Sequence, residues 1–467
     1  MSHSLFERLG RAPGEIAVLG LGKSGAAVCA LLRRDGLAVY ASDGGTTPAV
    51  LANAARLREL GAAVETGAHD LDRIARAALV VASPGVPPTA RPLIVAAEHG
   101  VPVVGEMEVA LQAMPALHCI AITGTNGKTT TTALVGHMLR AFVNAVDAGN
   151  IGTALAEFAL QSPQPAWAAL ECSSFQLHDT PGIAPTVGVV TNLSPDHLDR
   201  YPSVDEYYGD KARLFANATP ASRWVLNGDD DAVMHLHDRL GRGDSLPGQV
   251  RTFRIGSPAD AWFERETGML HLLGEPLLAR DAFPLVGDHN VANALAAALA
   301  VATAFPDADM ALLRTTIAAR LCTFHALPHR LEPVHTTDGR LWLNDSKATN
   351  VSSTLVAVQG MTRPFVLLLG GRHKGEPYTA LATPFASHGK MVIAYGEAAG
   401  EVVCDLGALV RVERVDGPFD AVIERARALT MPGDAILLSP ACSSFDMFTN
   451  YEERGAAFRT LARGSAA

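Results

Sequence analysis

The sequence contains no long uninterrupted run of apolar residues. Its longest apolar-rich stretch, residues 291–305, is interrupted by Asn293 and Thr303. It is therefore shorter than the roughly 20 residues that a membrane-spanning helix needs. The first eight residues, MSHSLFER, include no apolar segment of the kind found in secretory signals. We therefore expect neither a membrane span nor secretion, and we expect a cytoplasmic protein.

Paired cysteines and basic tracts are also missing. The six cysteines form no Cys-x-x-Cys pair, which argues against a disulfide framework and against a zinc site. Lys and Arg number 38 against 48 Asp and Glu, so the net charge is −10. Binding to a nucleic-acid polymer needs clustered basic residues, and we expect no such partner. A local basic pocket for a small anion is still compatible with this composition.

The chain has ample material for buried cores. Hydrophobic residues make up 48 % of it and charged residues only 18 %, the opposite of a disordered chain. At about 150 residues per domain, 467 residues predict about three domains. Short β-rich runs alternate with Ala/Leu-rich helical stretches, which is typical of α/β domains with parallel sheets.

Three segments can be separated along the chain, with boundaries at 1–106, 107–327 and 328–467 and linkers near 104–114 and 324–328. Helices are expected at 25–34, 128–140 and 291–304, and residues 241–280 are expected to form a β-rich insertion. Strands are expected at 16–19, 37–41, 79–82, 119–123, 168–171, 187–191, 340–343, 365–369, 391–395 and 435–438.

A first glycine-rich loop, Gly20-Leu-Gly22-Lys-Ser-Gly25, follows a predicted strand and opens a predicted helix. Together with Asp43 at the end of the next strand, it matches the Rossmann dinucleotide fingerprint. Helix N-terminal amides suit a pyrophosphate, and an acid suits a ribose hydroxyl. Both NAD and UDP conjugates contain such a pyrophosphate. The loop at residues 83–87, which follows the strand predicted at 79–82, is expected at the same sheet edge.

A second loop, residues 123–130, has the sequence Thr-Gly-Thr-Asn-Gly-Lys-Thr-Thr and again lies between a strand and a helix. Its amides form an anion nest, Lys128 suits the β- and γ-phosphates, and the Thr129 hydroxyl suits Mg²⁺. The loop departs from the full P-loop pattern because Ile122 stands where the first glycine belongs. These features predict a P-loop-type central ATPase domain between two Rossmann-like domains.

Carboxylates and a histidine follow other strands of this central segment. Glu171 ends one strand, where it can complete a Mg²⁺ shell. Asp196 and His197 follow the next one and could hold a second metal ion. Lys211, taken alone, is typical of a solvated helical lysine.

The third segment also has polar loops after its strands, at 344–350, 370–375 and 439–446. Because the carboxyl ends of parallel strands share one sheet edge, these loops predict a single site. Lys347 and Lys374 give that site the charge to bind an anionic substrate or phosphate.

With these motifs the chain resembles the Mur ligase family over nearly its whole length. The resemblance rests on residues 123–130, 149–152, 171–176, 196–199, 289–293, 328–330, 344–350 and 439–446 running on to 450–455. The last two motifs look particular to the glutamate-adding member, and the Asp-Asn-Pro-Arg motif of diaminopimelate- and lysine-adding relatives is absent. The resemblance implies a monomeric ATP-dependent ligase that joins D-glutamate to UDP-N-acetylmuramoyl-L-alanine in peptidoglycan precursor synthesis, through an acyl phosphate.

The resemblance also implies a role for individual residues. Glu171, His197 and a carbamylated Lys211 are implied to bind two Mg²⁺ ions with Thr129, and Lys347 to neutralise charge in catalysis. The UDP substrate is implied to contact Leu21, Gly22, Ser24, Asp43, Ser83, Pro84 and Gly85, and its muramoyl-alanine arm Asn150, Ser173, Gln176 and His197. ATP is implied to contact Gly124, Thr125, Asn126, Gly127, Lys128, Thr129, Thr130, Asn290, Asn293, Arg330 and Asp345. Glutamate is implied to contact Thr349, Lys374, Ser444, Phe445 and Tyr451.

Three other functions are compatible with parts of this pattern. The first loop alone would suit an NAD-dependent dehydrogenase, and the second alone a P-loop switch or sensor without turnover. Within the family, folylpolyglutamate synthesis is the nearest rival, although the 439–446 motif disfavours it. One departure affects uracil recognition: Gly44-Gly45 follows Asp43, where the family commonly has larger or charged side chains.

Overall fold

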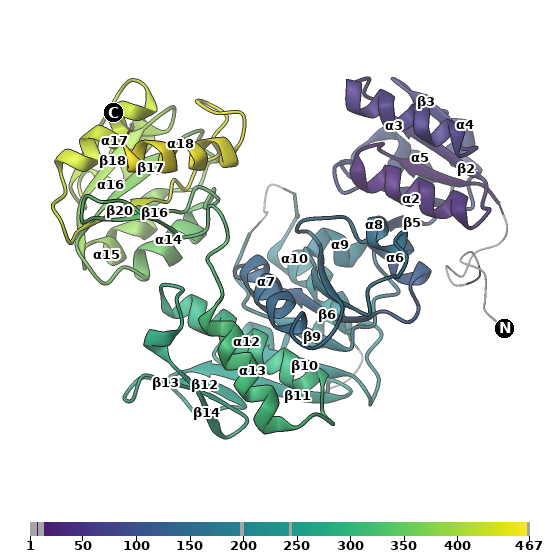
Figure 1. Ribbon diagram of the computed structural model, residues 1–467. Helices are drawn as coiled ribbons and strands as arrows, with labels where there is room; N and C mark the ends of the chain where they lie inside the picture. Colours follow the sequence, from purple (N-terminus) through teal and green to yellow (C-terminus); the bar gives the residue numbers. More distant parts are fainter. Residues whose placement is uncertain (1–6, 8–13, 197–199, 242–244, 465–467) are drawn as a thin grey trace. The chain divides into compact units, whose positions relative to one another are not determined.

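A computed structural model of the chain describes residues 7, 14–196, 200–241 and 245–464. The chain divides into two compact units, one formed by the residues up to Arg280 with Ala292–Cys322 and the other by Asp281–Val291 with the residues from Thr323 onward. The described residues form three separate sheets, each associated with helices (Figure 1). The fold class is thus α/β, as the sequence predicts.

The first sheet has five parallel strands in the order β3-β2-β1-β4-β5. The strands predicted at 16–19 and 79–82 are confirmed, whereas the second strand begins two residues later than predicted. The strands are β1 (Ile16–Leu19), β2 (Val39–Asp43), β3 (Ala63–Thr66), β4 (Leu79–Ala82) and β5 (Val103–Gly105). The associated helices are α2 (Lys23–Arg34), α3 (Pro48–Glu59), α4 (Leu71–Ala75), α5 (Arg91–Glu98) and α6 (Glu106–Ala113).

The linker predicted near residues 104–114 is wrong. These residues form the end of β5 and the whole of α6. The apolar core stabilises this helix, because Met107, Val109 and Ala110 are fully buried in the same core as β1 and β2. The Glu106 carboxylate also accepts a hydrogen bond from the Ala156 amide. The other predicted linker, 324–328, contains neither helix nor strand.

The second sheet has nine strands in the order β14-β13-β12-β11-β10-β9-β6-β8-β7, and only its β12–β13–β14 end is antiparallel. Its strands are β6 (His118–Thr123), β7 (Ala145–Gly149), β8 (Trp167–Glu171), β9 (Val187–Val190), β10 (Arg223–Asn227), β11 (Gln249–Ile255), β12 (Ala261–Glu264), β13 (Met269–Leu272) and β14 (Glu275–Ala279). The last four strands confirm the β-rich insertion predicted for residues 241–280.

The helices of the central segment lie between and after the strands of this sheet in the sequence. They are α7 (Lys128–Leu139), α8 (Leu155–Ala159), α9 (Ser174–His178), α10 (Val204–Ala212), α11 (Asp231–Met234), α12 (Asp288–Ala304) and α13 (Met310–Cys322). The helix α12 begins three residues earlier than the predicted helix at 291–304 and ends at the same residue.

The third sheet has the order β15-β16-β20-β17-β18-β19, and β15 alone is antiparallel to its neighbour. Its strands are β15 (Glu332–Val334), β16 (Leu341–Asn344), β17 (Phe365–Gly370), β18 (Gly389–Tyr395), β19 (Val412–Arg414) and β20 (Ala435–Leu438). Its helices are α14 (Val351–Gln359), α15 (Ala382–Phe385), α16 (Ala399–Leu406), α17 (Phe419–Ala428) and α18 (Tyr451–Arg463). Separate apolar cores pack on its two faces.

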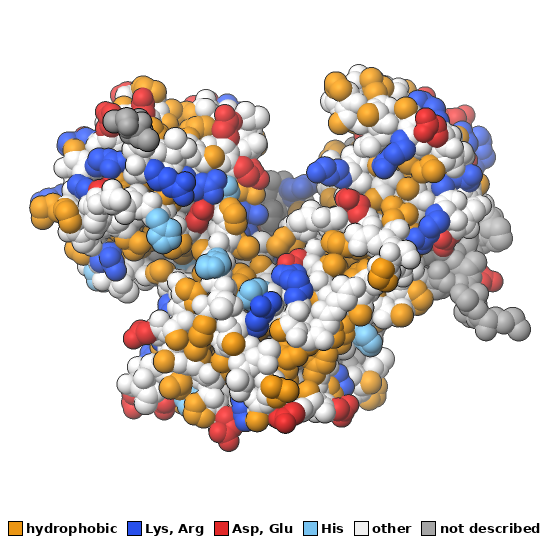
Figure 2. Space-filling model, in the orientation of Figure 1, with side chains coloured by type: hydrophobic (Ala, Val, Ile, Leu, Met, Phe, Trp, Pro, Cys, Tyr) orange, Lys and Arg blue, Asp and Glu red, His pale blue; other side chains and the backbone are white. Residues whose placement is uncertain are grey.

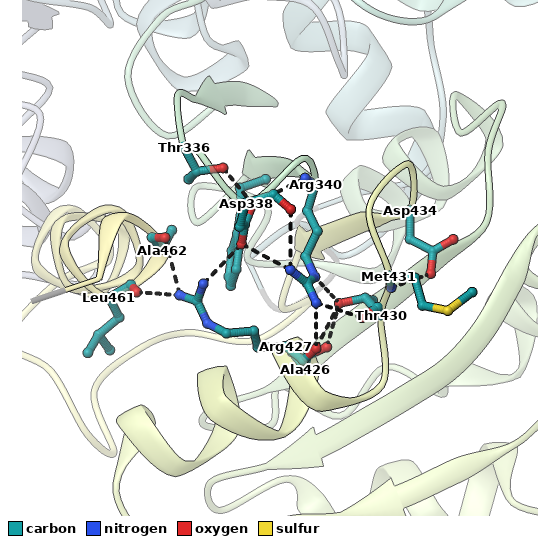
Figure 3. Close-up of polar contacts among 11 residues, drawn as sticks. Thr336, Asp338, Arg340, Ala426, Arg427, Thr430, Met431, Asp434, Leu461 and Ala462 are labelled. Carbon is teal, nitrogen blue, oxygen red and sulfur yellow. Dashed lines mark hydrogen bonds and ion pairs between the residues drawn. The ribbon is translucent and has the colours of Figure 1, made fainter.

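An acid at the β15–β16 turn ties this sheet to two helices. Asp338 accepts hydrogen bonds from the Trp342 indole and from Arg427 of α17, and it forms an ion pair with Arg340 (Figure 3). Arg427 in turn donates to the carbonyl oxygens of Leu461 and Ala462 at the end of α18. Two guanidinium groups therefore share one carboxylate.

The described surface is of mixed charge. On the face shown in Figure 2, Lys and Arg side chains stand in small separate groups with acidic and neutral side chains between them. Among the residues that the structure describes, no helix is both long and apolar enough to cross a lipid bilayer.

Candidate active site

A pocket of about 490 Å³ lies at the carboxyl edge of the first sheet. It is lined by the turns that follow β1, β2 and β4, including Gly22, Ser24, Asp43 and residues 83–85. The two predicted loops meet there, because the Ser83 hydroxyl donates to the Gly20 carbonyl oxygen at 3.1 Å. The fold thus brings together nearly all of the residues that we expected to contact a diphosphate nucleotide.

Asp43 holds the glycine-rich turn in shape. Its two carboxylate oxygens accept hydrogen bonds from the Leu21 and Gly45 amides, each at 2.7 Å. Leu21 itself is fully buried, and its carbonyl oxygen accepts from the Asn53 side chain. Leu21 therefore supports the turn from beneath, whereas Asp43 lines the pocket and keeps lone pairs for a ligand hydroxyl.

The loop predicted to bind phosphate, residues 123–130, lies between β6 of the second sheet and α7, and we call it the phosphate loop. The loop after β9 braces it, since Asn126 and Asn192 exchange hydrogen bonds of 2.9 Å. Gly124 has φ +141°, and a Cβ there would lie 2.0 Å from the Thr191 hydroxyl oxygen. Gly127 has φ +83° and is the N-cap of α7. The backbone of this loop can therefore approach an anion closely.

Lys128 folds back over this loop. Its Nζ donates to the carbonyl oxygens of Gly124 and Thr125 at 3.0 and 2.7 Å. Asn293 of α12 lies against the same loop: a Cβ on Gly127 would come within 2.3 Å of its Oδ1. Thr129 and Thr130 are buried in the first turn of α7. A cation, hydroxyls and the N-terminus of a helix thus lie together at this loop.

Glu171 lies at the same edge, since its strand neighbour in β6 is Ile122. The side chain is only 2 % exposed. Its Oε1 accepts from the Asn150 amide group at 3.0 Å, whereas Oε2 is buried without a hydrogen-bond partner among the described residues. A buried carboxylate oxygen without a partner is costly, and a bound cation would satisfy it.

Lys211 of α10 is buried, with 1 % of its surface exposed. Its Nζ donates to the Gly124 carbonyl oxygen at 2.7 Å and lies 4.5 Å from the centre of the Tyr207 ring. Burial, reinforced by the positive charge of Lys128, holds the pKa of Lys211 well below its usual range. The structure therefore excludes a solvated helical lysine and places this amine beside the phosphate loop.

Other residues expected in the central site have local partners. Ser173 and Gln176 form a reciprocal capping box at the start of α9. Asn290 and Asn293 lie one turn apart on α12, and both are buried. His197 lies outside the described residues. Among the described residues, no group of three or more His, Cys, Asp or Glu side chains is arranged to hold a metal ion.

At the third sheet, Asp345 and its neighbours follow β16. Asp345 accepts from the Ser439 hydroxyl at 2.8 Å and from the Leu331 amide at 3.2 Å. Burial raises its pKa to about 7, although the Arg330 charge acts in the opposite direction. The Nζ of Lys347 lies 5.3 Å from the centre of the Tyr451 ring.

The residues expected to bind glutamate lie in loops at this edge. The Nζ of Lys374 donates to the Thr349 hydroxyl at 3.3 Å, so two of the predicted loops meet. Ser444 is buried, whereas the ring of Phe445 is 61 % exposed. An exposed aromatic ring offers an apolar face to a ligand.

Sequence reasoning missed two polar residues at these edges. His69 lines the first pocket, and it follows β3, a strand that we did not predict. Arg454 of α18 is 1 % exposed and donates to the carbonyl oxygens of Ser346 and Cys442, so it joins two site loops. It belongs to the quoted 450–455 motif, but burial of an arginine is not visible in a motif.

Family models match three successive parts of the chain. They are described as the Mur ligase MurD-like N-terminal domain at residues 14–105, the Mur ligase middle domain at 122–301 and the Mur ligase glutamate ligase domain at 329–442. Each matched part contains most of one of the three sheets.

Curated relatives resemble nearly the whole chain. A UDP-N-acetylmuramoylalanine–D-glutamate ligase of Acidobacterium capsulatum is 38 % identical over 97 % of this chain and 97 % of its own length. The protein of that name from Anaeromyxobacter dehalogenans is 40 % identical over 96 % of this chain and 97 % of its own.

Solved structures share the fold at lower identity. The UDP-N-acetylmuramate–alanine ligase of Thermotoga maritima matches with a TM-score of 0.57 at 19 % identity, covering 95 % of this chain and 98 % of that chain. The folylpolyglutamate synthase of Mycobacterium tuberculosis matches with a TM-score of 0.58 at 18 % identity, covering 76 % of this chain and 93 % of that chain. Similarities at this level concern the fold alone.

Proposed function

The chain belongs to the Mur ligase family, and we propose that it joins D-glutamate to UDP-N-acetylmuramoyl-L-alanine at the expense of ATP. The full-length relatives with that named activity support the choice of substrates. The structural observation behind the chemistry is the meeting of Lys128, Glu171 and buried Lys211 around one phosphate loop. A dehydrogenase built on the first glycine-rich turn does not explain these residues.

We assign one task to each predicted segment. Residues 1–106 bind the UDP moiety in the pocket that Ser24, Asp43 and Ser83–Gly85 line. Residues 107–327 bind ATP and metal, and residues 328–467 bind glutamate. In this assignment Asn150, Ser173, Gln176 and His197 bind the muramoyl-alanine arm of the nucleotide substrate. Three separate sheets, each with polar loops at strand ends, support the division.

The reaction has two steps. A carboxylate oxygen of the substrate attacks the γ-phosphorus of ATP, the bond to the bridging oxygen breaks, and ADP leaves with an acyl phosphate formed. The glutamate nitrogen then attacks the carbonyl carbon, loses a proton, and phosphate departs with the former carboxylate oxygen. Positioning and charge neutralisation dominate such chemistry. Lys128 and Lys347 supply positive charge for the transferred group.

The ATP-binding residues come from several elements. The loop Gly124–Thr130 holds the phosphates, with Asn293 packed against it. Asn290 stands one turn before Asn293 on α12. Arg330 and Asp345 contact the nucleotide from the third segment in this proposal. Their proximity to each other is supported by the effect of the Arg330 charge on Asp345.

Magnesium fits the residues beside the phosphate loop. Glu171 presents a buried oxygen without a partner, and Thr129 presents a hydroxyl, so both are oxygen ligands of the kind Mg²⁺ prefers. With His197 and a modified Lys211 they would hold two ions. Bound Mg²⁺ supplies neutralisation of the charge that develops on the phosphate oxygens.

We further propose that Lys211 is carbamylated. Its neutral amine would attack the carbon of CO₂ and release a proton, which leaves a carbamate anion on Nζ. Burial beside the Gly124 carbonyl and the Tyr207 ring supports this, because Lys211 forms no ion pair among the described residues. A carbamate in its place would offer a negative oxygen to a metal ion.

An assay of ADP release tests the proposed function. We expect release that requires both UDP-N-acetylmuramoyl-L-alanine and D-glutamate and that is weak with L-glutamate. Release with a folate substrate and L-glutamate instead would assign the chain to the folylpolyglutamate branch. Binding of ATP without any ADP release would indicate the switch or sensor without turnover.

Lys128 is the residue to change in this assay. Lys128→Ala removes the cation from the phosphate loop, so kcat is expected to fall by at least about a thousandfold. Lys390→Ala is the matched control, because Lys390 pairs with Asp434 away from the site loops and its loss should leave kcat within about twofold. Near-normal turnover by Lys128→Ala contradicts the assignment of the loop.

A further inference from the structure

The first pocket contains a histidine that the assigned roles leave unused. His69 belongs to the loop between β3 and α4 and lines the pocket together with Gly44 and Gly45. Its Nδ1 is hydrogen-bonded to the hydroxyl of Ser42, a fully buried residue, at 2.8 Å. The hydrogen bond to Ser42 of β2 therefore fixes the orientation of the imidazole ring.

The backbone on both sides of His69 is anchored as well. The Gly67 amide donates to the Asp43 carbonyl oxygen at 2.8 Å. The Asp70 amide donates to the Tyr40 hydroxyl at 2.7 Å, and that hydroxyl donates to Glu65 at 2.6 Å. A side chain fixed in this way loses little entropy when a ligand binds, which is a feature of a recognition residue rather than of a solvated loop.

The second ring nitrogen faces the space left by two glycines. A Cβ built on Gly44 would lie 3.4 Å from His69 Nε2. No hydrogen bond to Nε2 is formed within the part of the chain that the structure describes, whereas Nδ1 is occupied. Nε2 is thus a polar atom presented to the pocket where Gly44 and Gly45 contribute no side chain.

The order of the strands indicates which part of a bound nucleotide would lie next to His69 Nε2. The turn after β1 and the N-terminus of α2 suit the pyrophosphate. Asp43 at the end of β2, the next strand, suits the ribose. His69 follows β3, which lies beyond β2 in the sheet, so the next group outward is the base.

We propose that His69 is the residue that reads the pyrimidine base, with Nε2 hydrogen-bonded to its polar edge. This rests on the proposed UDP-linked substrate. In this arrangement the Ser42 hydroxyl donates to Nδ1, so that Nε2 carries the proton and donates to the C4 carbonyl oxygen of uracil. Cytosine replaces one carbonyl by an amino group and the N3–H by an acceptor, so it is the discriminating probe.

The test uses the full chain, with the affinities for UDP and CDP measured by calorimetry and steady-state kinetics alongside. His69→Ala is expected to raise the KM for the UDP substrate about tenfold, since one hydrogen bond in a formed site is lost. The KM for ATP and kcat should stay within twofold, and the preference for UDP over CDP should nearly vanish. His69→Gln, which keeps a polar end, should recover part of the affinity.

Two further variants keep the result interpretable. Gly44→Val directs a branched side chain toward Nε2 and should weaken UDP without touching the histidine. His99→Ala changes an exposed histidine of the same segment, whose ring is hydrogen-bonded to the Val95 carbonyl oxygen, and it should leave the UDP affinity unchanged. Unaltered UDP affinity of His69→Ala overturns the proposal while the ligase assignment stands. An equal loss for UDP and inorganic pyrophosphate overturns it too, since His69 would then contact phosphate. If the wild type binds no UDP, the proposed function itself fails.

Discussion

Two lysines show how position decides chemistry at the scale of single residues. Lys374 lies in a loop and donates to the Thr349 hydroxyl, and Lys211 is almost fully buried in α10. Both stand in polar segments of the sequence. Burial depends on residues distant in the chain, above all on the Gly124 carbonyl and the Tyr207 ring. Without the family resemblance, Lys211 would therefore have been interpreted as a surface residue.

The proposed carbamate leads to a rescue experiment. Lys211→Ala removes the group that would bind metal, so ligase activity is expected to fall by at least about a hundredfold. A small carboxylic acid such as formate fits the space of the missing carbamate and should restore part of the rate. Equal activity of wild type and variant, or no response to the acid at any concentration, would contradict the carbamate.

At the scale of elements, the sequence predicted strands better than connections. The buried strands at 16–19, 79–82 and 435–438 were predicted to the residue, because short apolar runs between polar loops have few alternatives. The stretch 104–114 was misjudged as a linker. Its acidic residues look solvated in sequence, but Glu106 and Glu108 are both buried through hydrogen bonds to backbone amides.

The buried acid Glu106 should make stability depend on pH. Burial raises its pKa to about 7, against 4.5 for an ordinary glutamate. The folded chain therefore keeps a proton that the unfolded chain has lost, and the free energy of unfolding falls as the pH rises through this window. Glu106→Gln removes that dependence while its amide oxygen can still accept from Ala156.

Denaturation of wild type and Glu106→Gln at pH 5 and pH 8 measures the effect. The free energy of unfolding of the variant, measured relative to that of the wild type, is expected to rise by up to about 3 kcal/mol from pH 5 to pH 8. Glu98→Gln is the matched control, because the Glu98 side chain is 51 % exposed and should show no such gain. Parallel stability curves for Glu106→Gln and wild type would show that Glu106 is ionised in the folded chain.

The Asp338 cluster gives a second prediction at this scale (Figure 3). Asp338→Ala deprives the Trp342 indole and two guanidinium groups of a shared acceptor, so the third sheet should lose about 2 to 4 kcal/mol of stability. Thermal unfolding followed by tryptophan fluorescence measures the loss. Asp416→Ala is the control: its side chain is 74 % exposed in an ion pair with Arg414, and a similar loss there would contradict the account.

At the scale of the whole molecule, the sequence predicted three nucleotide- or anion-binding edges, and the structure has three sheets with polar loops after their strands. The sequence could not indicate which hydrogen bonds hold the site residues and their loops in position. His69 follows a strand with a weak pattern, and Arg454 acts through carbonyl groups that no motif encodes. Single motifs also left NAD and UDP equally open. Membership of the Mur ligase family, which the family models show, favours UDP over NAD.

The central claim is that these edges serve one ligation through an acyl phosphate. Its most direct test uses UDP-N-acetylmuramoyl-L-alanine labelled with ¹⁸O in the carboxylate, together with ATP and D-glutamate, and measures the label in the released phosphate by mass spectrometry. The account predicts one ¹⁸O atom transferred to phosphate for each amide bond formed. Amide formation with unlabelled phosphate, or phosphate release without amide formation, would contradict it.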